Sequence, residues 1–236
     1  MSENAERGSR NAEQMAAGEL REFRVAVARS ARYFALGEPN AGTREVWFAC
    51  HGYGQLAARF IRHLAGIAEP GRVIVAPEGL SRFYLGTGEH RNEKVGASWM
   101  TREDRLAEID DYVRYLDAVH ADVVRSLDPR AVSVTAFGFS QGTATASRWA
   151  ALGAARIDRL ILWGGEVPPD LDLTLARDRL KDATLMIVAG TTDPYVTEKI
   201  LMRDSGRLEA ARIPFQLHRF EGGHEIPAEV LRRFAV

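Results

Sequence analysis

The strongest constraint on the fold is an alternation of two kinds of segment along the chain. From residue 22 onward, short apolar runs typical of β-strands alternate with segments whose apolar residues recur every three or four positions, as in amphipathic helices. This alternation favours an α/β fold, with a mostly parallel sheet of about eight strands and helices on both faces, because parallel strands need crossover connections. We expect one domain over residues 22–236 and a flexible arm over residues 1–21.

The element boundaries follow from these runs. The first two strands, at 23–27 and 31–36, are expected to form an antiparallel pair. Further strands are expected at 46–50, 72–77, 131–137, 159–163, 184–190 and 215–220, and helices at 56–68, 104–126, 141–152, 173–181, 195–211 and 226–235. Residues 77–102 form the longest irregular stretch, which we interpret as one wall of a substrate site; a surface loop without a ligand is the alternative.

Composition excludes several classes of protein. The 31 Lys and Arg residues are balanced by 32 Asp and Glu residues, so no broad basic field points to nucleic acid as the main partner. Cys50 is the only cysteine, which rules out an intramolecular disulfide and a cysteine-only zinc site. We expect no metal, no stable membrane insertion, no export signal in the polar first twenty residues, a cytoplasmic location, and a monomer or homodimer.

The segment Gly138-Phe139-Ser140-Gln141-Gly142 has the pattern G-x-S-x-G. It lies between an expected strand and an expected helix, which is the strand–turn–helix setting of a nucleophile elbow. The glycines make room for a tight turn that exposes the serine hydroxyl at the edge of the sheet. Ser140 is therefore our candidate nucleophile, and a glycine-flanked turn with a surface serine is the alternative.

A serine nucleophile needs a base, and His224 is our candidate. It follows the last expected strand in Glu221-Gly222-Gly223-His224, where a glycine-rich loop can bring the imidazole over the edge of the sheet. A loop histidine that is bonded only for structure is the alternative. The other histidines are less suited, since they fall in helices, in a strand, in the long loop or beside the first glycine-rich turn: 51, 63, 90, 120 and 218.

The carboxylate that orients this base is expected after an intervening strand. Asp193 fits, because it follows the run at 184–190 and precedes Pro194, which restricts its backbone to extended conformations. Asp170 and Asp172 are the competing candidates. With Asp193, the chain order is nucleophile, acid, base, as in α/β-hydrolases.

Acyl transfer also needs two donors for the oxyanion of the tetrahedral intermediate. The backbone N–H of Gln141 is one candidate, because it follows the nucleophile directly. The second is the N–H of Tyr53, in the turn Gly52-Tyr53-Gly54 that follows the run at 46–50. His51, in the same turn, is expected to brace this loop beside the substrate and not to act as the base.

These motifs resemble the phospholipase/carboxylesterase family of the α/β-hydrolase superfamily, which includes acyl-protein thioesterases and small bacterial esterases. The resemblance covers about residues 22–234 and is carried by the segments 51–54, 138–142, 193–194 and 223–224. It implies a fold without a separate cap domain and cofactor-free hydrolysis of carboxylic esters. Thioesters or lysophospholipids are substrates of some members.

Two features bear on how far the resemblance extends to the substrate site. Tyr53 is bulkier than the small aliphatic residue common at its position in the thioesterases, which implies a narrower or more polar acyl entrance. Trp99 lies in a segment that resembles a pocket-lining segment of the family, and we name Trp99 and His51 as candidate substrate contacts, with a plain packing role as the alternative for Trp99.

The sequence thus predicts a serine carboxylic-ester hydrolase for small or medium acyl esters, with Ser140, Asp193 and His224 as a catalytic triad that forms an acyl-enzyme. A small-molecule ester is the expected partner, and no cofactor is expected. A thioesterase, a lysophospholipase, an acyltransferase that uses the same residues, and a catalytically silent binding protein are the alternatives.

Overall fold

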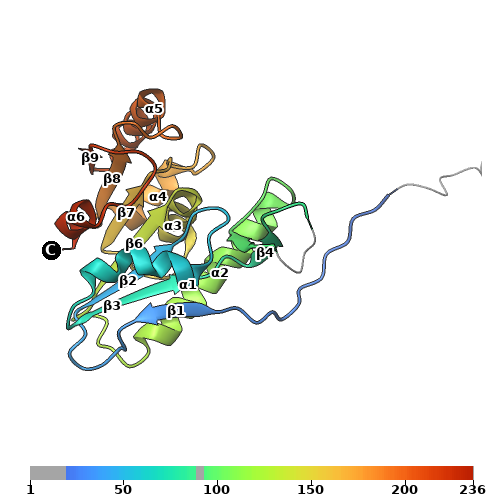
Figure 1. Ribbon diagram of the computed structural model, residues 1–236, viewed down its shortest axis with the longest axis horizontal. Coiled ribbons are helices and arrows are strands. Elements are labelled where there is room, and N and C mark those ends of the chain that lie inside the picture. Colours follow the sequence, from blue (N-terminus) through green and yellow to red (C-terminus); the bar gives the residue numbers. More distant parts are fainter. Residues whose placement is uncertain (1–19, 89–92, 236) are drawn as a thin grey trace, which may run out of the picture. The chain divides into compact units, whose positions relative to one another are not determined.

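The computed structural model describes residues 20–88 and 93–235 (Figure 1). Contacts divide the chain into two units, Met1–Ser30 and Ala31–Val236. Residues 20–30 form no helix or strand, so the predicted strand at 23–27 is wrong. The alternating apolar residues of that segment are exposed, and the antiparallel pairing expected for the strand at 31–36 is made with another strand of the second unit. The predicted division at residue 22 stays a prediction, since most of the arm lies outside the described residues.

The second unit is built on a seven-stranded sheet in the order β1-β3-β2-β6-β7-β8-β9. The strands are β1 (Tyr33–Leu36), β2 (Glu45–Cys50), β3 (Arg72–Pro77), β6 (Ser133–Phe139), β7 (Arg159–Trp163), β8 (Thr184–Gly190) and β9 (Phe215–Phe220). All neighbouring pairs are parallel except β1 with β3, which is antiparallel. The mostly parallel sheet is therefore confirmed, with seven of the eight predicted strands in it.

Helices cover both faces of this sheet, as predicted (Figure 1). One face carries α2 (Arg105–Val124), α3 (Gln141–Leu152), α4 (Leu173–Leu180) and α5 (Glu198–Ala210). The other carries α1 (Ala57–Phe60) with the 3₁₀ helix η1 (Ile61–Ile67), and α6 (Ala228–Leu231) with η3 (Arg232–Phe234). Among the described residues, no helix combines the length and apolar character that a bilayer span requires.

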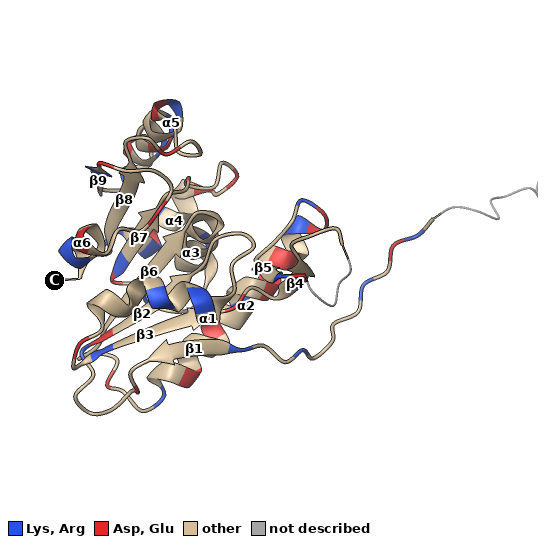
Figure 2. Ribbon diagram, viewed as in Figure 1, with Lys and Arg blue, Asp and Glu red and all other residues tan. Residues whose placement is uncertain are grey.

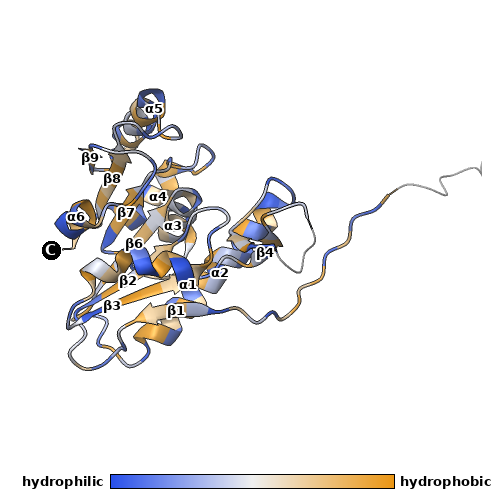
Figure 3. Cartoon of the chain, in the orientation of Figure 1, coloured by the Kyte–Doolittle hydropathy of each residue, from blue (hydrophilic) through white to orange (hydrophobic). Residues whose placement is uncertain are grey.

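The strands alternate between the two layers of the core. In β2, Val46 and Phe48 pack under α2 and α3, whereas Trp47 and Ala49 pack under α1 and η1. Both sets are fully buried, which explains why the strand reads as a continuous apolar run and not as an alternating one. Figure 3 shows β3 as hydrophobic over most of its length, and Figure 2 shows both signs of charge mixed over helices and loops.

The stretch 77–102 is not wholly irregular. It contains a second, two-stranded sheet, in which β4 (Ser81–Tyr84) pairs antiparallel with β5 (Val95–Ser98). Each strand has only four residues, too few for a period-two pattern to stand out in the sequence. The N–H of Gly54 donates to Ala97 O at 2.9 Å, which fastens this hairpin over the loop that follows β2.

The two-layer core predicts a large contrast between two leucines of α2. Leu116 is fully buried between α2 and the sheet, whereas Leu106 is 73% exposed on the same helix. Leu116→Ala should lower the free energy of unfolding by about 2–5 kcal/mol, because it leaves a cavity, and Leu106→Ala by no more than about 0.5 kcal/mol. Urea unfolding followed by circular dichroism measures both. Equal losses would contradict this packing.

Candidate active site

The turn between β6 and α3 holds Ser140 in a strained backbone conformation. Ser140 has φ 54° and ψ −119°, backbone angles that residues other than glycine rarely adopt. A β-carbon at Gly138 would clash with the carbonyl of Gly142, and one at Gly142 would clash with the carbonyl of Cys50. The predicted strand–turn–helix setting is confirmed, and it places Ser140 at the positive end of α3.

His224 and Asp193 lie on neighbouring loops at the same edge of the sheet. The Nδ1–H of His224 donates to Asp193 Oδ2 at 2.8 Å. The other carboxylate oxygen, Oδ1, accepts from the N–H groups of Tyr195 at 2.8 Å and Val196 at 3.2 Å. Because the Asp193 side chain is buried and held on both oxygens, it fixes the imidazole in the tautomer whose Nε2 is free to accept a proton.

Two glycines after β7 join this pair to the serine turn. A β-carbon at Gly164 would lie 3.3 Å from His224 Nδ1, and one at Gly165 would clash with the carbonyl of Ser140. The ring of Phe139, beside the serine, lies 4.9 Å from the ring of His224. The loops after β6, β7, β8 and β9 therefore converge on one point. The carboxylate of Glu166, which directly follows these glycines, accepts from Arg203 at 2.7 Å.

The competing carboxylates are occupied elsewhere. Asp170 pairs with Arg148 at 2.7 Å and with Arg105. Asp172 caps α4, where hydrogen bonds from the hydroxyl and N–H of Thr174 lower the pKa of its carboxyl. Of the three aspartates considered, Asp193 is the one that the structure brings to His224.

His51 is a buried brace of the loop after β2. Its Nδ1–H donates to Gly52 O at 2.8 Å, and its Nε2 accepts from the N–H of Gly79 at 2.9 Å, so both ring nitrogens are used within the fold. The indole N–H of Trp99 donates to His51 O at 2.8 Å, and the two rings lie 5.0 Å apart. Burial lowers the pKa of His51, which favours the neutral ring that these bonds require.

Trp99 is buried behind this loop, at 1% exposure. It also meets Tyr112 edge to face, with ring centroids 6.2 Å apart. These contacts hold the loop from behind, and the substrate contacts expected of Trp99 and His51 stay predictions. Cys50 is fully buried, and burial raises the pKa of its thiol, as for an inert cysteine.

The side chain of Gln141 ties the hairpin to the serine turn. Its Nε2 donates to Met100 O at 2.9 Å and to Ser98 Oγ at 3.1 Å, and its Oε1 accepts from the N–H of Trp99 at 3.2 Å. Sequence reasoning assigned only the backbone of Gln141. The sequence did offer a signal for the side-chain role, because a polar residue directly after the serine, at the start of a buried helix, needs hydrogen-bond partners.

Glu78 is a second residue that sequence reasoning missed. It directly follows β3, and its buried carboxylate accepts from Arg32 Nε at 2.8 Å and from the N–H of Ala57 at 3.3 Å. These bonds fix the start of α1 and the backbone at Gly79, which in turn holds His51. A carboxylate directly after the apolar run at 73–77 was the signal for a paired, buried charge.

The predicted oxyanion donors flank the serine in space. A β-carbon at Gly52 would lie 3.2 Å from Ser140 Cβ, so the turn that contains Tyr53 reaches the nucleophile. The Tyr53 side chain is exposed and lies against Phe83 of the hairpin, with ring centroids 5.1 Å apart. The donor roles of the Tyr53 and Gln141 N–H groups stay predictions.

The protein is similar to known proteins in its structure but not detectably in its sequence. No family model and no curated protein matches the sequence. The solved structure of acyl-protein thioesterase 2 from Zea mays is 16% identical with a TM-score of 0.66, and covers 87% of this chain and 96% of its own. Esterase PE8 is 20% identical with a TM-score of 0.62 (88% and 97% covered), and a carboxylesterase from Mesorhizobium loti is 18% identical with a TM-score of 0.62 (86% and 93% covered).

The chain has the α/β-hydrolase fold. Among its described residues, the β4–β5 hairpin is the excursion that lies over the sheet edge, and no separate cap domain covers it.

A cavity of about 250 Å³ opens beside His224 in this α/β-hydrolase fold. Its walls combine apolar and polar groups, contributed by the loop after β2, by η1, by the end of β6 and by the loop after β9. They are formed by Gln55, His63, Phe139, His224, Glu225 and Ile226. A cavity of this size is at the small end for ligand sites.

The buried, neutral His51 predicts a loss of stability in acid. The unfolded chain binds a proton on this residue near pH 6.5, and the folded chain resists doing so, so the free energy of unfolding should fall as pH falls below about 6.5. His51→Gln should reduce this pH dependence, whereas His63→Gln, at an exposed position, should keep it. Urea unfolding between about pH 7 and pH 5 measures the slopes, and an unchanged slope in His51→Gln would contradict the neutral assignment.

Proposed function

We propose that the protein is a serine esterase of the phospholipase/carboxylesterase family. The observation that carries the proposal is the 2.8 Å hydrogen bond from His224 to the buried Asp193, made beside a half-buried serine whose backbone is strained. Buried carboxylate, imidazole and strained serine at one sheet edge are the parts of a nucleophilic triad. The esterase and thioesterase descriptions of the similar structures support the same reaction class.

In the first half of the reaction, Ser140 Oγ forms a bond to the ester carbonyl carbon while His224 Nε2 takes its proton. Asp193 stabilises the imidazolium that results, through the bond to Nδ1. The N–H groups of Tyr53 and Gln141 donate to the oxyanion of the tetrahedral intermediate. When the intermediate collapses, the carbon–oxygen bond to the alcohol breaks, and His224 returns its proton to the leaving oxygen.

In the second half, water replaces the alcohol. His224 takes a proton from the water while the water oxygen bonds to the acyl carbon. His224 then protonates Ser140 Oγ as the bond between Oγ and the acyl carbon breaks. The net reaction adds one water to the ester and releases an acid and an alcohol. No cofactor takes part in these steps.

Small or medium acyl esters are the proposed substrates. The cavity beside His224 holds about 250 Å³, and its polar walls would tolerate an oxygen-rich group next to the reacting carbonyl. The ring of Tyr53 is exposed and lies against Phe83, and its bulk is proposed to narrow the acyl entrance. A cytoplasmic location and a monomeric or homodimeric state remain predictions.

The first test of this function is replacement of the nucleophile. Ser140→Ala should lower kcat/KM for a chromogenic short-chain ester by at least about 10³-fold, because the acyl-enzyme can no longer form. Intact-protein mass after treatment with a fluorophosphonate should show one adduct on the wild type and none on this variant. Ser126→Ala, at an exposed serine in the turn after α2, should keep both properties. A folded Ser140→Ala variant with unchanged turnover would overturn the proposal.

A second test concerns the carboxylate. Asp193→Asn should lower kcat by about 10³- to 10⁴-fold, because the amide no longer holds His224 in the accepting tautomer. The losses in Asp193→Asn and His224→Ala should not add in the double variant, since both residues serve one proton transfer. Asp170→Asn is the matched control and should retain most of the activity. Equal losses in the two asparagine variants would point to a structural effect.

A further inference from the structure

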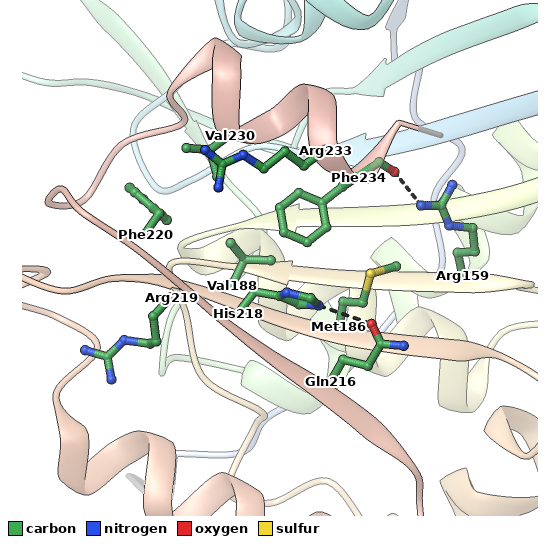
Figure 4. Close-up of a pocket in the computed structure, with 10 residues that line it drawn as sticks. All are labelled: Arg159, Met186, Val188, Gln216, His218, Arg219, Phe220, Val230, Arg233 and Phe234. Atoms are coloured by element: carbon green, nitrogen blue, oxygen red, sulfur yellow. Dashed lines mark hydrogen bonds between the residues drawn. The ribbon is translucent and has the colours of Figure 1, made fainter.

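A second cavity lies away from the serine turn, on the face of the sheet covered by the C-terminal helices. It has a volume of about 290 Å³ and is bounded by β7, β8 and β9 on one side and by α6 and η3 on the other (Figure 4). It shares no lining residue with the cavity beside His224. The proposed esterase mechanism therefore does not use it.

The ionisable side chains that line this cavity are all basic. Three arginines and one histidine contribute to its walls, and none of its ten lining residues is an Asp or a Glu. The remaining walls include Met186 and Val188 on the sheet and Phe234 on η3. Such a lining would suit a ligand with one anionic group and an apolar body.

The arginines differ in how far they are already paired. Arg159 donates to Phe234 O, and the guanidinium of Arg219 pairs with Glu198 at 2.7 Å. Arg233 is exposed at the mouth, and no hydrogen bond or ion pair joins it to another residue of the described ranges. Its guanidinium is thus the cation that is free to meet an incoming anion.

His218 provides a polar group at the cavity floor. Its Nε2 bonds with Gln216 Oε1 at 3.1 Å, and its ring meets Phe234 edge to face, with centroids 5.0 Å apart (Figure 4). The histidine is therefore held in place between the strand and η3. Figure 4 shows Arg233 on the helical side of the cavity and His218 on the strand side.

We propose that this cavity is a binding site for a small amphipathic carboxylate, whose two oxygens meet the Arg233 guanidinium and whose apolar body packs on Met186, Val188 and Phe234. A guanidinium offers two parallel N–H donors that match the planar carboxylate group. The volume is at the low end for ligand pockets, which limits the apolar body to a short chain or one ring.

The site lies next to the segment that carries His224. Trp163 contacts both Phe220 and Phe234 of the cavity wall, with ring centroids 5.6 Å apart in each case. Its indole N–H donates to Glu225 O at 2.8 Å, one residue beyond His224. The Trp163 indole is thus a neighbour of the ligand site and a spectroscopic reporter for it.

The test is isothermal titration of sodium octanoate into the full chain carrying Ser140→Ala, so that the result does not depend on the proposed hydrolysis. We expect a saturable single site. Arg233→Ala in that background should weaken the affinity by about tenfold, because a charge-assisted pair is lost. Gln216→Trp should abolish binding by filling the cavity while its arginines remain. Arg232→Ala, the matched neighbour that does not line the cavity, should change the affinity by less than about twofold.

Other outcomes would overturn the proposal. No saturable octanoate binding to the folded protein excludes the site. Equal weakening in Arg232→Ala and Arg233→Ala shows only a general effect of surface charge. Octanol binding as tightly as octanoate removes the role of the carboxylate, and tighter binding of octyl phosphate assigns the site to a phosphate. Circular dichroism of each variant checks the fold, and a change in tryptophan fluorescence on titration provides a second, independent readout.

Discussion

The candidate site depends on one close backbone approach, between the turn that carries Ser140 and the end of β2. A β-carbon at Gly142 would clash with the Cys50 carbonyl, so the first turn of α3 lies directly against the neighbouring strand. This approach holds Ser140 at a positive φ and brings Gly52 within van der Waals distance of its side chain. Strained turn, helix N-terminus and glycine-rich loop are therefore consequences of one packing constraint.

The parallel sheet supplies the second requirement, because it gathers the ends of successive strands at one edge. Ser140, Asp193 and His224 are far apart in the chain, yet each follows the carboxyl end of a neighbouring or near-neighbouring strand. The loops that hold them are fixed by buried polar contacts. The Gly79, His51 and Trp99 hydrogen bonds support the loop after β2, and the buried Asp193 supports His224. Because these hydrogen bonds are buried, water does not compete for their donors and acceptors, and each loop keeps a single geometry.

Most of the fold was predictable from local pattern, because buried parallel strands and amphipathic helices each leave a periodic signature. Seven strands were found where apolar runs occur, and the G-x-S-x-G turn lies between strand and helix as expected. The segment at 23–27 has the same signature but forms no strand, since a strand also needs a neighbour to pair with. The β4–β5 hairpin is stabilised by the loop after β2, and local pattern does not contain that partner.

In the candidate site, too, local sequence pattern predicts one part and tertiary contacts decide the other. The sequence alone determined the residue types, their order along the chain and the strand ends that they follow, because these depend on local spacing. Only the tertiary structure decided that Asp193 and not Asp170 reaches His224, that His51 is used within the fold on both ring nitrogens, and that Gly164 and Gly165 join the loops. Those outcomes depend on distances across strands that are remote in the chain, and on which buried polar groups find partners there.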